Sequence, residues 1–218
     1  MTTQVMPESQ VTDTFPINGT DFVEFWVGNA RQAAAYYQHA WGYRLTAYRG
    51  PETGTRDRAS YVLEQGKIRL ILTTAIRPDG PIADHVARHG DGVRDIAFWV
   101  DDATDAYRKA LQHGGQGVQE PQVLEDEQGR VVHAAIRTYG ETIHSIVERK
   151  DYRGPFMPGF VPATSLVQPH AVGLLYVDHC VGNVELGRMN HWVAFYRDVL
   201  GFTQLISFDD KDISTEYS

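Results

Sequence analysis

The feature that most restricts the fold of this chain is an internal repeat of one strand–turn–helix pattern. Residues 27–29 read Val-Gly-Asn, and residues 181–183 read the same three residues. In both places an apolar run precedes the tripeptide and a helix-forming run follows it. Gly42 and Gly201 then stand where a helix C-terminal glycine belongs. The repeat predicts that the C-terminal part of the chain is a second copy of the N-terminal part.

The first copy has the element order β-α-β-β-β. A run rich in aromatic and β-branched residues at 21–27 predicts a strand, and Asn29 is a candidate N-cap for a helix over 30–41. Three further strand patterns follow at residues 43–48, 59–65 and 68–74. A short helical stretch at 82–89 comes next.

The same order then returns. A strand at 93–100 precedes a helix at 102–113, which Asp101 or Asp102 opens and the Gly114-Gly115 pair closes. Strands are expected at residues 118–124, 131–138 and 142–149. The sequence therefore predicts an α+β fold of paired β-α-β-β-β modules. They form one domain over residues 16–150, after a polar tail at 1–15.

A shift in composition marks the end of this domain. Residues 151–173 hold four prolines and three glycines, which is typical of a linker. Residues 174–218 then begin a second copy with a strand at 174–184, one helix and two short strand-like pieces, the last at 212–218. We expect this second domain to be cut short, with apolar surface left uncovered.

Composition narrows the class of protein. The chain has 20 basic and 28 acidic residues among 218, a net charge of −8, which argues against nucleic-acid binding. The single cysteine, Cys180, cannot form an internal disulfide. No apolar run approaches about 18 residues and no secretory signal is visible, so we expect a cytoplasmic protein without a membrane span.

His179 is the histidine of greatest interest because it lies in the expected strand at 174–184. Strand alternation would place Val177, His179 and Val181 on one face and Cys180 on the other, so His179 and Cys180 would not share a metal. A lone histidine in an apolar strand is more often a hydrogen-bonded core residue. Its counterpart in the first copy is Phe25. That pattern suits either a metal site confined to the second copy or drift at a core position.

Five segments of the chain resemble bacterial 4-hydroxyphenylpyruvate dioxygenases. They are HGDGVRDIAF, GPFMPGFVP, DHCVGN, FYRDVLGF and DISTEYS, and they occur in the family's order from about residue 16 to the end of the chain. The family lies in the vicinal oxygen chelate superfamily, whose β-α-β-β-β modules match the element order above.

The resemblance implies a non-haem Fe(II) enzyme of tyrosine and phenylalanine catabolism. It would convert 4-hydroxyphenylpyruvate and O₂ to homogentisate and CO₂. Two histidines and a glutamate would hold the iron as a facial triad. His179 matches the first ligand, and Val181 would line the substrate pocket. The family also implies a homo-oligomer.

The chain departs from the family at the other two ligands. They lie in His-Ile-Ala and Phe-Glu-Ile-Ile-Glu-Arg motifs of the second domain's second module, which this sequence lacks. The first-domain counterparts are Asp95 and Ser145, which cannot complete a triad with Phe25. We therefore expect the 218-residue chain to bind iron weakly and not to turn over alone. The alternatives are a 4-hydroxymandelate synthase, or a non-catalytic fragment or assembly module.

One pair of histidines elsewhere in the chain is spaced so that it could share a metal. His85 and His89 are four residues apart on an expected helix, so both could face one metal. A zincin helix needs glutamate directly after the first histidine, and Val86 stands there. With no third ligand visible, the sequence predicts a solvent-facing pair.

Overall fold

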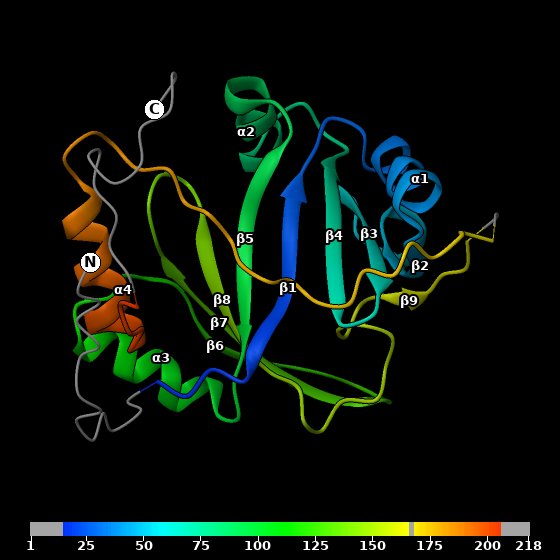
Figure 1. Cartoon of the computed structure of the whole chain (residues 1–218). Coiled ribbons are helices and arrows are strands. Elements are labelled where there is room, and N and C mark those ends of the chain that lie inside the picture. The colour runs from blue at the N-terminus through cyan, green and yellow to red at the C-terminus, as the bar shows by residue number, and fades with distance from the viewer. Residues whose placement is uncertain (1–14, 166–167, 206–218) are drawn as a thin grey trace.

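The structure is a computed structural model that describes residues 15–165 and 168–205. Its described residues form one curled mixed sheet of nine strands in the order β6-β7-β8-β5-β1-β4-β3-β2-β9 (Figure 1). Helices α1, α3 and α4 pack on one face of this sheet. The predicted α+β architecture of paired modules is confirmed.

The first module follows the predicted order. It comprises β1 (Gly19–Trp26), α1 (Ala30–Trp41), β2 (Arg44–Arg49), a 3₁₀ turn (Pro51–Thr53), β3 (Arg58–Gln65) and β4 (Ile68–Ala75). β4 returns to pair with β1 in parallel, and β3 pairs antiparallel with both β4 and β2. The crossover helix α1 makes the parallel pairing possible.

The second module repeats this arrangement after α2 (Pro81–His89). It comprises β5 (Gly92–Trp99), α3 (Ala103–Gln112), β6 (Gly117–Asp126), β7 (Gly129–Arg137) and β8 (Ile143–Glu148). β8 runs parallel to β5, and β5 pairs antiparallel with β1, so the two modules meet at the centre of the sheet. Strand boundaries differ from the predicted ones by one or two residues at most positions, as fraying ends commonly do.

The helix ends are where the sequence signals place them. The Asn29 side chain accepts a hydrogen bond from the Gln32 N–H at 3.0 Å, and Asp102 caps α3 in the same way. Gly42 ends α1 with a φ of 72°. Helix α4 (Met189–Leu200) ends at Gly201 with a φ of 69°, as α1 ends at Gly42, but its N-cap residue, Arg188, makes no side-chain capping hydrogen bond.

The first residues of the proline-rich segment after β8 are packed into the core. Phe156, Met157 and Phe160 are buried against the face of the sheet that carries no helices. The short strand β9 (Val161–Pro162) then pairs with β2 at the sheet edge. The first half of the predicted linker is therefore docked rather than free.

The strand predicted at 174–184 is wrong, because these residues form no strand in the structure. The segment instead crosses the helix-bearing face of the central strands as an irregular chain (Figure 1). Gln65 holds its start, with Oε1 accepting from the backbone N–H groups of Val172, Gly173 and Leu174 at 3.2 Å. A strand needs a neighbouring strand for its backbone hydrogen bonds, and the described chain offers none beside this segment.

The two remaining strand-like pieces have different outcomes. Residues 201–205 form no strand, and the piece at 212–218 lies outside the described residues. Among the residues that the structure describes, no helix is long and apolar enough to cross a membrane.

Candidate functional site

Two cavities lie beneath the irregular segment that carries the predicted site residues. The larger, of about 590 Å³, lies between the sheet, this segment and α4. Its walls include the aromatic rings of Phe98, Tyr139, His144, Trp192 and Tyr196. The smaller, of about 480 Å³, is lined by β1, β4 and β5 residues and by the same segment. Apolar walls with a few polar groups are typical of small-molecule sites.

A buried histidine fixes the wall of the larger cavity. His144 Nδ1 lies 2.8 Å from the Ile96 carbonyl, which can only accept, so this nitrogen carries the proton. Nε2 therefore accepts from the Tyr196 hydroxyl, also at 2.8 Å. Burial lowers the pKa of His144 to about 4, so the ring is neutral near neutral pH. The pair ties α4 to β8.

Replacing Tyr196 by phenylalanine is therefore expected to destabilise the protein by about 1–3 kcal/mol, because a buried acceptor loses its donor. Urea unfolding followed by circular dichroism measures the change. Tyr176→Phe is the matched control, since the Tyr176 side chain is exposed. Equal midpoints for the two variants would show that the His144–Tyr196 hydrogen bond does not stabilise the docking of α4.

His179 and Val181 both lie on the irregular segment but border different cavities. His179 lines the larger cavity, with a largely exposed side chain whose Nδ1 is 2.6 Å from Asp178 Oδ2. Val181 lines the smaller cavity and is 77% exposed. Cys180 borders both cavities. Without a strand, the predicted alternation of faces does not hold.

The described residues around His179 do not fit an Fe(II) triad. Within 15–165 and 168–205, His179 belongs to no group of three histidine, cysteine, aspartate or glutamate side chains close enough to hold a metal ion. Its own Nδ1 is already engaged by Asp178. A facial-triad Fe(II) site needs two histidines and one carboxylate, and the described residues supply only one histidine here.

The first-domain counterparts of the iron ligands only partly converge. Ser145 donates to Asp95 from its N–H at 2.9 Å and from its hydroxyl at 2.5 Å. Phe25, however, packs against Tyr37 of α1 on the other face of the sheet. Glu24 is the residue that pairs with Asp95 across β1 and β5 and shares its face. Phe25 therefore lies on the opposite face of the sheet from Asp95 and Ser145.

Asp95 sits in a buried polar cluster on that face. Burial raises its pKa to about 7, and the nearby Glu24 carboxylate adds to the increase, although hydrogen bonds from Ser145 oppose it. His133 Nε2 lies 2.8 Å from the Ser145 hydroxyl, and burial lowers the pKa of His133 to about 4. The two positions that the resemblance matches to iron ligands of the second domain are thus held in direct contact by an Asp95–Ser145 hydrogen bond.

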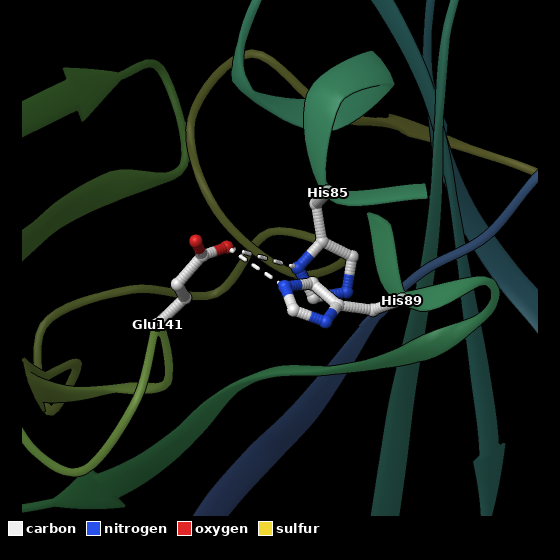
Figure 2. A group of neighbouring side chains, drawn as sticks. All are labelled: His85, His89 and Glu141. Carbon is white, nitrogen blue, oxygen red and sulfur yellow. Dashed lines mark ion pairs between the residues drawn. The ribbon is translucent and has the colours of Figure 1, made fainter. Parts of the chain in front are cut away.

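The structure brings together a group that the sequence did not reveal. Glu141, in the turn between β7 and β8, lies beside His85 and His89 of α2 (Figure 2). His85 is 5% exposed, so the prediction of a solvent-facing pair is wrong. The third ligand was invisible because Glu141 is more than fifty residues away in the chain, in a turn with no motif of its own.

The charges of this group follow from its surroundings. Burial, and then the neighbouring His89, lower the pKa of His85, so its ring is neutral near neutral pH. For Glu141, partial desolvation acts to raise the pKa, but Arg88 and His89 outweigh it and hold the pKa below its usual value. The group thus combines a neutral imidazole with an ionised carboxylate.

Comparison with known proteins agrees with the fold and the resemblance. Residues 12–156 match the family described as "Hydroxyphenylpyruvate dioxygenase, HPPD, N-terminal". The 4-hydroxyphenylpyruvate dioxygenase of Neurospora crassa is 42% identical over 96% of this chain and 56% of its own length. The Dictyostelium discoideum enzyme is 44% identical over 93% of this chain and 57% of its own length. The chain thus spans about half the length of the curated relatives it matches.

Solved structures support the same placement. A mutant 4-hydroxymandelate synthase from Streptomyces coelicolor superposes with a TM-score of 0.71 at 27% identity, covering 86% of this chain and 53% of that one. Methylmalonyl-CoA epimerase from Mycobacterium tuberculosis, at 19% identity and a TM-score of 0.51, covers 62% of this chain and 90% of its own and shares the fold. By these matches, the chain belongs to the 4-hydroxyphenylpyruvate dioxygenase family.

Proposed function

We propose that this chain supplies the N-terminal domain and the first part of the catalytic domain of an Fe(II)-dependent 4-hydroxyphenylpyruvate dioxygenase. The domain boundaries in this proposal are the predicted ones, at 16–150, 151–173 and 174–218. His179 would provide one of three iron ligands, and Val181 would line the pocket for the substrate. The observation that carries the proposal is 40–44% identity to named dioxygenases over nearly the whole chain.

The surface of the C-terminal segment supports this division. Large apolar side chains with exposed fractions of 61–105% lie at Leu175, Tyr176, Val181, Leu186 and Leu205. So many large apolar side chains exposed along one segment call for a covering partner. The rest of a catalytic domain, or a second subunit of the expected homo-oligomer, would supply one.

Because the described residues offer one iron ligand of three, we propose that the 218-residue chain does not catalyse turnover alone. After anaerobic loading with Fe(II), addition of 4-hydroxyphenylpyruvate and O₂ should give no more O₂ consumption than free Fe(II) does. An oxygen electrode measures the consumption of O₂, and chromatography measures the formation of homogentisate. Turnover by the isolated chain would overturn the proposed inactivity.

A chimera tests the role of His179 directly. Residues 1–218 followed by the remaining C-terminal part of the Neurospora crassa relative should form homogentisate. In this chimera, His179→Ala should lower turnover on the order of 100-fold or more, because a metal ligand is lost. His170→Ala, at an exposed position outside both cavities, is the control. A folded, iron-loaded chimera without activity would favour the non-catalytic assembly module.

The likeness to 4-hydroxymandelate synthase makes that reaction the second candidate. Its identity of 27% is lower than the 40–44% shared with the dioxygenases. The complete protein of this proposal, with its own catalytic domain in place of the grafted one, distinguishes the two by its product. Hydroxymandelate in place of homogentisate would favour the synthase.

A further inference from the structure

We propose that His85, His89 and Glu141 form a binding site for one divalent metal ion of the zinc class, separate from the proposed iron ligand. The site joins the last turns of α2 to the turn between β7 and β8 (Figure 2). None of the three residues corresponds to a ligand position of the resembling family. The site therefore goes beyond the proposed dioxygenase function and does not depend on it.

The spacing of the donor atoms suits a single small cation. One nitrogen from each ring and one Glu141 carboxylate oxygen all lie within 4.8 Å of one another. His89 Nε2 is 3.3 Å from Glu141 Oε2, and His85 Nδ1 is 3.8 Å from the same oxygen. Zinc bonds of about 2.0–2.1 Å in a tetrahedron place neighbouring donors about 3.4 Å apart. Both distances to Glu141 Oε2 lie within a few tenths of an ångström of this spacing.

The second observation is the unsatisfied buried ring of His85. Only 5% of this residue is exposed, yet neither ring nitrogen has a hydrogen-bond partner among the described residues. One side of the ring is closed by Gly92, where a Cβ would lie 3.2 Å from Nε2, and Trp26 packs edge-on at 5.4 Å. Nδ1 faces Glu141. A buried imidazole nitrogen without a partner is costly, and a metal bound at Nδ1 would satisfy that one of the two.

The surroundings of Glu141 orient its carboxylate. Arg88 binds Oε1, which leaves Oε2 for the two histidines, and Arg94 donates to the Glu141 backbone oxygen. The guanidinium of Arg94 itself lies 4.7 Å from the centre of the Trp26 ring. The two arginines oppose cation binding, so only a metal with strong affinity for imidazole should bind. This requirement favours zinc over magnesium or calcium.

The group is also open to solvent on one side. His89 has a side chain that is 48% exposed and Glu141 one that is 37% exposed. An ion can therefore enter, and water can take the fourth position. With three protein ligands of this kind, the site would clamp α2 onto the second module.

Calorimetric titration of the untagged, metal-free 218-residue chain with Zn²⁺ tests the proposal. We expect one equivalent to bind. His89→Ala and Glu141→Gln, both at exposed side chains, should each weaken binding by about tenfold or more. Co²⁺, titrated in parallel, should give the strong visible absorption of a tetrahedral site, and this absorption should be lost in both variants.

Two controls make the result specific. His39→Ala removes an exposed histidine of α1, and His179→Ala removes the proposed iron ligand; both should bind Zn²⁺ like the parent chain. Circular dichroism checks that each variant is folded. Absence of saturable binding, parental affinity in folded His89→Ala and Glu141→Gln, or loss of binding in His179→Ala would each overturn the site. The turnover of the chimera is measured separately, so failure of one proposal leaves the other standing.

Discussion

Replacing Asp21 by alanine is expected to destabilise the protein by about 3–5 kcal/mol. Asp21 is buried in β1, where Arg69 of β4 and Arg149, directly after β8, both bind its carboxylate. The Arg149 Nε contacts both carboxylate oxygens, at 2.9 and 3.0 Å. Removing the shared carboxylate leaves two guanidinium groups close together and largely out of water. Arg69 would keep its ion pair with Glu64 at 2.8 Å, whereas Arg149 would keep only the Phe156 carbonyl. The cost therefore comes mainly from the unpaired charge of Arg149 and from its repulsion with Arg69.

Urea unfolding at constant ionic strength measures the effect. Asp79→Ala is the control, because Asp79 pairs with Arg77 on the surface, where both side chains are at least 65% exposed. Such a pair contributes about 0–1 kcal/mol. A loss of less than about 1 kcal/mol in Asp21→Ala would mean that water reaches the two arginines more freely than their burial indicates.

The sequence predicted the N-terminal part of the fold well because its signals are local. Asn29 and Gly42 mark the ends of α1 by their own side-chain and backbone chemistry, whatever packs around them. The order of elements then restricted the topology, because in each module the four strands must form one sheet with the helix packed on its face. The segment at 174–184 has equally good strand residues. A strand also needs a pairing partner, and local composition does not report one.

The candidate sites show the same limit. Phe25 was matched to His179 by the register of the repeat, and the structure places it on the opposite face of the sheet from Asp95, whose cross-strand partner is Glu24. The His85–His89 spacing was visible in the sequence, but its meaning depends on Glu141, which only the folding of β7 and β8 brings near. Residue types and spacings predict which groups are available. Long-range pairing decides which of them meet.

The buried carboxyl of Asp95 is expected to make stability fall as pH rises. Burial raises its folded pKa to about 7 from the usual 3.8, so between these values the folded state keeps a proton that the unfolded state has lost. Stability from this group is therefore fully present at low pH and is lost as pH rises towards 7. His133 and His144, with pKa values lowered to about 4, act in the opposite sense below about pH 6.5.

Asp95→Asn isolates the contribution of Asp95, because the two histidines and Glu24 remain in both proteins. The amide can still accept from the Ser145 N–H and can donate to its hydroxyl. The difference in unfolding free energy between the variant and the parent should grow in the variant's favour by about 2–3 kcal/mol from about pH 5 to about pH 8. Asp79→Asn, at an exposed carboxyl, should follow the parent at every pH. A difference between Asp95→Asn and parent that stays constant with pH would show that Asp95 is ionised in the folded state. Asp95, which the resemblance matches to an iron ligand, would then be a charged carboxylate that its neighbours stabilise. It would not be a neutral acid hydrogen-bonded to Ser145.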